Sequence, residues 1–295
     1  MTPVTDLGLL FDVDGPLASP VTRTVAIPEI LADLVALTAA GVPIAFITGR
    51  SDAFVREQLL GPLREAGLSD VLGAGIGRMF GVFEKGAVEA PITGAGLGEL
   101  VVDAELALPQ VVVDSVRDLV DSEFADTMFF DDTKRAMVSV EQRTEVDSER
   151  YHAAQGPFND RVFAIAEDAG IGIRYGDRVA ADADGKVPFR IDPTIISTDL
   201  ESVLLDKDRG AERALHYFAG LGELPRRWRT IGDSRSDYKM ADYLHGAGFD
   251  VSHVDVRPSD GVLERPYPVI TIGDAIHDEA GARFLAHWVH QLGAS

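Results

Sequence analysis

The feature that most constrains the fold is a short apolar run near the N-terminus that ends in two aspartates. Residues 7–11 read Leu-Gly-Leu-Leu-Phe and are followed by Asp12-Val13-Asp14-Gly15. Such a run is typical of a buried strand in a parallel sheet. Because side chains at i and i+2 point the same way, we expect both carboxylates to project from the carboxyl end of the strand, where open α/β sheets bind ligands. Two like charges this close predict a divalent-metal site, an acid–base pair or both, unless the carboxylates merely cap an Asp-Gly turn.

The following segment alternates helical and strand patterns. Residues 28–40 carry apolar side chains at helical spacing, and residues 42–47 form a second apolar run that ends in Thr48-Gly49-Arg50. Another helical pattern comes next. Polar residues therefore follow each strand at its carboxyl end. This order predicts an α/β fold with a doubly wound, Rossmann-like parallel sheet as its core.

A change in the pattern of predicted strands and helices indicates a second domain inserted into this core. Turn-rich segments and short strands interleaved with helices indicate an α+β insertion at 85–190, between core segments 1–84 and 191–295. The elements expected in or next to the insertion are strands near 100–102, 136–141, 172–175 and 187–191 and helices over 111–124 and 158–169.

Two further polar sites appear where the parallel domain resumes. Lys207 opens a helical pattern, and an apolar strand over 228–231 ends in Gly232-Asp233. Asp237 follows four residues later, on the opening helix. A carboxylate pair at i and i+4 can face one point, as a hard divalent cation requires.

Composition excludes several classes of protein. The net charge of −21 argues against nucleic-acid or anionic-membrane partners, and the lack of cysteine excludes disulfides and thiolate metal sites. The N-terminus lacks the pattern of a signal peptide, and no apolar run approaches the ~20 residues of a membrane-spanning helix. We expect a soluble, cytoplasmic monomer or homodimer whose partner is a small molecule.

Together, four motifs resemble those of the haloacid dehalogenase superfamily of aspartate-nucleophile phosphohydrolases. They are, in chain order, Asp12-Val13-Asp14-Gly15, Thr48-Gly49-Arg50, Lys207 and Gly232-Asp233-Ser234-Arg235-Ser236-Asp237. The resemblance covers nearly the whole chain. The long insertion is similar to the large α/β cap of the sugar-phosphatase branch, which includes trehalose- and sucrose-phosphate phosphatases and the broad-range, Cof-like bacterial enzymes. Glu84-Lys85-Gly86-Ala87 resembles the Glu-Asn-Gly-Ala turn that often precedes this cap.

The resemblance implies a phosphomonoesterase that uses Mg²⁺ to hydrolyse a small phosphorylated metabolite, such as a sugar phosphate, through an aspartyl-phosphate. Asp12 would be the nucleophile. Asp14 would protonate the leaving alcohol and then activate water. Lys207 would offset the charge of Asp12 and the phosphate.

The same resemblance implies the remaining binding roles. The metal ligands would be Asp12, Asp14 through its backbone carbonyl, Asp233 and Asp237. The Thr48 hydroxyl and the Gly49 N–H would donate to phosphate oxygens. Arg50 would contact the substrate or support the residues that do, and the cap would close over the site and select the leaving group.

Pro16 departs from the family pattern, which usually has threonine after Asp-x-Asp-Gly. Proline removes a hydroxyl and a backbone N–H that could hold Asp14. A non-catalytic phosphometabolite-binding protein therefore remains an alternative. A sugar phosphomutase of the same fold is another, although mutases usually show Gly-Gly-Ser where this chain has Thr48-Gly49-Arg50.

Overall fold

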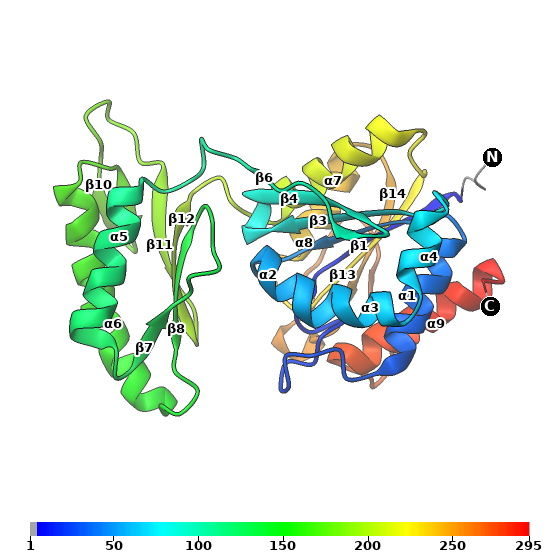
Figure 1. Ribbon diagram of the computed structural model, residues 1–295, viewed down its shortest axis with the longest axis horizontal. Coiled ribbons are helices and arrows are strands. Elements are labelled where there is room, and N and C mark those ends of the chain that lie inside the picture. The colour runs from blue at the N-terminus through cyan, green and yellow to red at the C-terminus, as the bar shows by residue number, and fades with distance from the viewer. Residues whose placement is uncertain (1–4, 295) are drawn as a thin grey trace. The chain divides into compact units, whose positions relative to one another are not determined.

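The computed structural model describes residues 5–294, which form two compact units (Figure 1). The first unit runs to Val101 and resumes at Asp206, and the second extends from Val102 to Leu205. The sequence analysis expected the insertion at 85–190, so both of its expected boundaries lie N-terminal to those of the second unit. Pairing between strands accounts for both differences, as described below.

The first unit is built on one large sheet. Its strands are β1 (Leu7–Phe11), β2 (Pro43–Ile47), β3 (Arg78–Phe83), β4 (Val88–Thr93), β5 (Gly96–Leu97), β6 (Val101–Val102), β13 (Arg227–Gly232), β14 (Asp250–Asp255) and β15 (Val269–Ile270). Their order in the described residues is β15-β14-β13-β1-β2-β3-β4-β5, with β6 beside β4. All pairs from β15 to β3 are parallel, which confirms the predicted parallel core. Because β4 pairs antiparallel with β3, the chain stays in this sheet beyond residue 85.

Helices cover both faces of the sheet. They are α1 (Pro28–Ala39), α2 (Asp52–Val55), α3 (Gly61–Glu65), α4 (Leu68–Gly73), α7 (Lys207–Leu221), α8 (Tyr238–Gly246) and α9 (His277–Leu292). The alternation of side chains along β1 shows the two layers. Leu10 joins a buried cluster with Phe218 of α7 and Met240 of α8, whereas the neighbouring Phe11 packs edge-on against Phe284 of α9, with ring centroids 6.1 Å apart. The core is therefore doubly wound, as the sequence predicts.

The second unit has a sheet and core of its own. Its strands are β7 (Met128–Phe130), β8 (Val138–Gln142), β9 (Ile173–Tyr175), β10 (Arg178–Ala180), β11 (Phe189–Pro193) and β12 (Ser197–Ser202), and its helices are α5 (Gln110–Leu119) and α6 (Ser148–Asp168). Within the described chain the strand order is β10-β9-β11-β12-β8-β7, and α5 and α6 lie on one face (Figure 1). Because β12 pairs with both β8 and β11, this unit extends past residue 190.

One helix of the second unit differs from the sequence-based expectation. The helix expected over 158–169 begins at Ser148, where the Asp147 carboxylate accepts a hydrogen bond from the Arg150 N–H (2.9 Å). It then continues through Pro157 without a break in the helix.

Over residues 5–294, no helix combines the length and the apolar character that crossing a membrane requires.

Candidate active site

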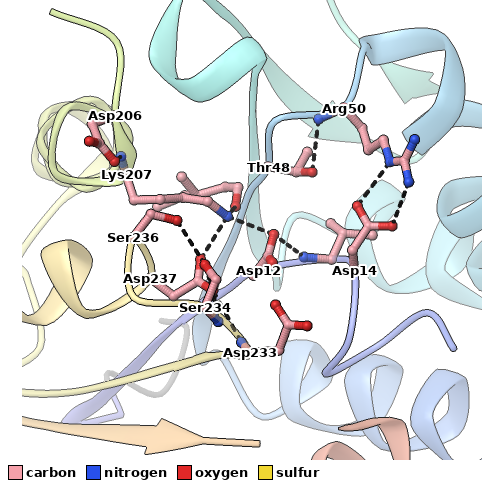
Figure 2. A network of polar contacts seen from close by, with 12 residues as sticks. Asp12, Asp14, Thr48, Arg50, Asp206, Lys207, Asp233, Ser234, Ser236 and Asp237 are labelled. Atoms are coloured by element: carbon pink, nitrogen blue, oxygen red, sulfur yellow. Dashed lines mark hydrogen bonds and ion pairs between the residues drawn. The ribbon is translucent and has the colours of Figure 1, made fainter. Parts of the chain in front are cut away.

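The carboxyl ends of three neighbouring strands bring the predicted motifs together. In the sheet register, Phe11 of β1 lies opposite Ile231 of β13 and Phe46 of β2. The Asp12 N–H continues this pairing by donating to the Ile231 carbonyl (2.9 Å). Residues just after these strands must therefore meet at one edge of the sheet. Figure 2 shows the motif side chains gathered there.

Lys207 lies at the centre of the group. Asp206 caps the N-terminus of α7, so Lys207 is the first residue of that helix. Its Nζ donates to Asp12 Oδ1 (2.6 Å) and to the Ile47 carbonyl (2.6 Å), and lies 3.0 Å from Asp237 Oδ1. Burial alone would favour the neutral amine, but the two carboxylates outweigh it and raise the pKa of Lys207. The side chain is therefore a buried, permanently charged ammonium.

Asp12 is buried next to this ammonium. Its Oδ1 also accepts a hydrogen bond from the Val13 N–H (2.8 Å). Burial and the nearby charge of Asp237 raise the pKa of Asp12 well above its usual value, against the opposing effect of Lys207. The charge of Lys207 therefore does not fully offset burial and the charge of Asp237 at Asp12.

Asp237 organises the turn after β13. Its Oδ2 accepts hydrogen bonds from the Asp233 N–H (3.1 Å), the Ser234 N–H (2.9 Å) and the Ser234 hydroxyl (2.8 Å). The turn is so close that a Cβ at Gly232 would lie 2.2 Å from the Asp237 Cβ. Burial opposes ionisation of Asp237, but Lys207 and these hydrogen bonds prevail and lower its pKa. Asp237 is therefore a fixed, ionised support.

Asp233 completes a cluster of carboxylates. One oxygen each from Asp12, Asp233 and Asp237 lie within 4.8 Å of one another. Burial and the charge of Asp237 raise the pKa of Asp233 to about 6, and Arg257, whose Nη1 lies 3.7 Å from Asp233 Oδ2, moderates the rise. Gly15 allows this approach, since it has φ +91° and a Cβ there would lie 2.8 Å from Asp233 Cβ.

This cluster suits a divalent cation. Carboxylate oxygens are the hard ligands that Mg²⁺ and similar ions prefer. Burial, and then the charge of Asp237, raise the pKa values of Asp12 and Asp233, and a bound dication would favour the ionised form of both carboxylates. Asp237 is the least available ligand, because its Oδ2 accepts three hydrogen bonds and its Oδ1 faces Lys207.

The second motif lies beside the cluster, on the loop after β2. Thr48 is buried, and its Oγ1 accepts a hydrogen bond from the Arg50 N–H (3.0 Å), so the hydroxyl hydrogen can be donated to another group. The side chain of Lys85 runs past Gly49, where a Cβ would lie 3.7 Å from Lys85 Cε. The Thr48 N–H donates to the Val82 carbonyl (3.0 Å), so the group that this loop can present to an anion is the Thr48 hydroxyl.

Asp14 points away from the three-carboxylate cluster. Its Oδ2 accepts from Arg50 Nε (3.0 Å) and its Oδ1 accepts from Arg50 Nη2 (3.1 Å) (Figure 2). Among residues 5–294, the group of three or more possible metal ligands is formed by Asp12, Asp233 and Asp237, without Asp14. The structure thus brings the predicted residues to one edge of the sheet, with the Asp14 side chain in a separate ion pair.

Some residues of this site were not singled out from the sequence. Ser234 holds Asp237, and its place within the Gly-Asp-Ser turn was the available signal. Arg257 follows β14 and pairs with Asp260 (2.7 Å) as well as approaching Asp233. Nothing in its spacing distinguishes it from other arginines. The Ile47 carbonyl, which binds Lys207, carries no side-chain signal at all.

Comparison with solved structures finds the same fold in sugar-phosphate phosphatases. The C. albicans trehalose-6-phosphate phosphatase C-terminal domain aligns with a TM-score of 0.59 at 14% identity, covering 98% of this chain and 93% of that one. The Aspergillus fumigatus trehalose-6-phosphate phosphatase aligns at 0.52 and 17% identity, with 98% and 93% covered. The Synechocystis sucrose-phosphatase, solved in complex with sucrose and phosphate, aligns at 0.53 and 14% identity, with 97% and 98% covered.

These alignments confirm the predicted fold over almost the whole chain, including the inserted unit. No family model matches the sequence, and no curated protein matches it either. The likeness to known phosphatases is thus one of structure at low sequence identity.

Proposed function

We propose that this chain, which shares its fold with sugar-phosphate phosphatases, is a Mg²⁺-dependent phosphomonoesterase of the haloacid dehalogenase type. The observation that carries the proposal is the contact between Lys207 and Asp12 at the edge of the sheet. A buried ammonium 2.6 Å from one carboxylate, within a cluster of two more, is what attack on a phosphate ester by a carboxylate requires. The attacking carboxylate and the phosphate ester are both negatively charged, so the positive charge of Lys207 and of a bound Mg²⁺ is needed to hold them together.

In the proposed first step, Asp12 attacks the phosphorus atom and forms an aspartyl-phosphate, while the bond from phosphorus to the leaving oxygen breaks. Asp12 Oδ1 is held by Lys207 and the Val13 N–H, which leaves Oδ2 as the attacking atom. Thr48 and the Gly49 N–H would donate to the phosphate oxygens. Lys207 would stabilise the negative charge that Asp12 and the phosphoryl group share.

Asp14 is the proposed acid and base. It would give a proton to the leaving oxygen in the first step and take one from the water that hydrolyses the aspartyl-phosphate in the second. Pro16 cannot support Asp14 through a hydroxyl or an N–H. The turn is instead closed by backbone bonds, since Ala18 N–H donates to the Val13 carbonyl (2.8 Å) and Gly15 N–H to the Ala18 carbonyl (2.9 Å). This closure holds the turn that carries Asp14 without the groups that Pro16 lacks.

Asp12, Asp233 and the backbone carbonyl of Asp14 are the residues that we propose to hold Mg²⁺. The ion, when bound, would neutralise phosphate charge and orient the phosphoryl group. Asp237 would support the metal site indirectly, because it accepts hydrogen bonds that fix the turn carrying Asp233. The contacts of Asp237 favour this supporting role over direct ligation, for which the sequence also made it a candidate.

We propose a sugar phosphate as the substrate. The structural neighbours include enzymes named for trehalose-6-phosphate and a sucrose-phosphatase in complex with sucrose and phosphate. We propose that the inserted unit at 102–205 selects the leaving group, because the core residues gathered at the sheet edge are those expected to act on the phosphoryl group.

Phosphate release from p-nitrophenyl phosphate and from a panel of sugar phosphates tests the proposal. We expect release by the native chain in Mg²⁺, none in EDTA, and at least a 10³-fold loss in Asp12→Asn. Equal release by the native chain and Asp12→Asn would contradict it, and no release by either would favour a binding protein. A phosphomutase would instead interconvert sugar phosphates, need a bisphosphate activator and release no net phosphate.

A further inference from the structure

The ion pair between Arg50 and Asp14 joins the second motif to the first. Both oxygens of the Asp14 carboxylate are engaged, at 3.0 and 3.1 Å, by the Nε and Nη2 donors of one guanidinium. Figure 2 shows the fork directed at Asp14, while Lys207 is directed at Asp12 and the Thr48 hydroxyl lies at the Arg50 backbone N–H. The sequence left two roles open for Arg50, contact with the substrate or support of the residues that make it. The geometry gives two of its donors to the proposed acid and base.

Arg50 is itself held in place. Its backbone N–H donates to Thr48 Oγ1 (3.0 Å), and its carbonyl accepts from the Glu84 N–H (3.1 Å). Its guanidinium lies over the ring of Phe54, 4.8 Å from the ring centroid. The side chain is 21% exposed, so it does not move freely in solvent. A rigid guanidinium can therefore impose an orientation on its partner.

Asp14 needs such an orienting partner. Its side chain is 33% exposed, and Pro16 offers no hydroxyl or N–H to hold it. An acid that protonates a leaving oxygen must lie within hydrogen-bond reach of that oxygen. A bidentate guanidinium fixes both the position and the plane of a carboxylate, which a lysine cannot do. Each carboxylate oxygen keeps a second lone pair, so the pairing leaves a position for the proton that is transferred.

We propose that Arg50 is a positioning residue for Asp14, which it aims at the leaving oxygen, and that it does not act as a phosphate ligand. The inference rests on the proposed function, because it assigns the leaving-group step to Asp14. It predicts that loss of Arg50 lowers kcat/KM most for the substrates whose leaving group most needs a proton. A phosphate ligand would matter equally for every leaving group.

Two aryl phosphates of similar size provide the test. The phenolate of phenyl phosphate is a poor leaving group that benefits from protonation, whereas p-nitrophenolate leaves readily without it. For Arg50→Ala we expect kcat/KM to fall about 10²-fold on phenyl phosphate and less than about 10-fold on p-nitrophenyl phosphate, given that general acid catalysis contributes ~10²–10⁴. kcat/KM is the appropriate quantity because it reports the steps up to leaving-group release.

Three companion variants make the result specific. Asp14→Asn should show the same dependence on leaving group, and adding Arg50→Ala to it should cause little further loss, because the two residues act as one unit. Arg50→Lys keeps the charge without the fork and should show an intermediate loss with the same dependence. Arg56→Ala is the matched control, since Arg56 pairs with Asp52 (3.5 Å) on the same helical segment, and it should leave both rates unchanged.

Inhibition by inorganic phosphate separates the two roles of Arg50. The inhibition constant should stay within about threefold of native in Arg50→Ala if Arg50 acts through Asp14. Equal losses on both aryl phosphates, together with weaker inhibition by phosphate, would overturn this inference and leave the proposed function standing. Activity that survives Asp12→Asn would overturn the proposed function instead. Thermal melting of each variant identifies any loss of activity that reflects unfolding. If Arg50→Ala is unfolded, the dependence of Arg50→Lys on the leaving group decides between positioning of Asp14 and phosphate binding.

Discussion

Replacing Lys207 with methionine tests whether the buried cluster depends on one cation. Methionine is also long and unbranched, so the change removes the charge and leaves most of the packing. Lys207 Nζ contacts Asp12 at 2.6 Å and Asp237 at 3.0 Å, with side-chain exposures of 7%, 10% and 0%. Breaking a buried ion pair by removing one partner costs about 3–5 kcal/mol. Asp12 can take up a proton, since its pKa is already raised, so we expect about 3 kcal/mol.

Urea unfolding followed by tryptophan fluorescence, in EDTA at neutral pH, measures this loss. The chain has two tryptophans, and both Trp228 and Trp288 lie in the unit that contains the site. Trp228 is fully buried, so its emission reports unfolding of that unit rather than of the insertion. Adding Mg²⁺ should restore part of the stability of Lys207→Met, because a dication bound to the carboxylates replaces the missing charge.

Lys239→Met is the matched control for this experiment. Lys239 also forms an ion pair, with Asp206, but its side chain is 47% exposed. Exposed pairs contribute about 0–1 kcal/mol, so this variant should differ little from native. If Lys207→Met lost less than about 1 kcal/mol, like the control, the cluster would not need its cation and the electrostatic argument for the site would fail.

Three further predictions concern charge near the site. Arg257→Gln should tighten Mn²⁺ binding severalfold in calorimetry, because Arg257 competes for Asp233, while the control Arg235→Gln should change it less; weaker binding in Arg257→Gln would contradict this. Mn²⁺ affinity should fall about tenfold per pH unit below about 6 as Asp233 takes up a proton, and an affinity constant from pH 7 to 5 would refute this assignment. Burial lowers the pKa of His253 to about 4 from an unfolded value of 6.5, so the unfolded chain takes up the proton first as the pH falls. Native stability should therefore drop between pH 6.5 and 4 by roughly 3 kcal/mol more than in His253→Gln, and equal slopes in denaturation curves would count against it.

The parallel core was predictable because two sequence signals mark the strands that carry the site. Each is a short apolar run, and each ends in a polar residue at the same edge, as at Asp12, Thr48 and Asp233. The boundaries of the insertion were less accessible. Strand β12 reads Ser-Thr-Asp-Leu-Glu-Ser, with one large apolar residue, and its place in the sheet depends on pairing with β8 and β11 from distant parts of the chain.

The site was predictable as a set of residues but not as a set of contacts. Spacing put Asp233 and Asp237 on one turn, yet an i, i+4 pair is compatible both with two metal ligands and with one ligand held by the other. The three hydrogen bonds to Asp237 Oδ2 and the ion pair of its Oδ1 with Lys207 favour the second arrangement. Arg50 illustrates the same limit, because its pairing with Asp14 depends on how two loops approach across the edge of the sheet. Residue type and spacing thus select the chemistry, while the division of labour among the charges follows from geometry that only the folded chain defines.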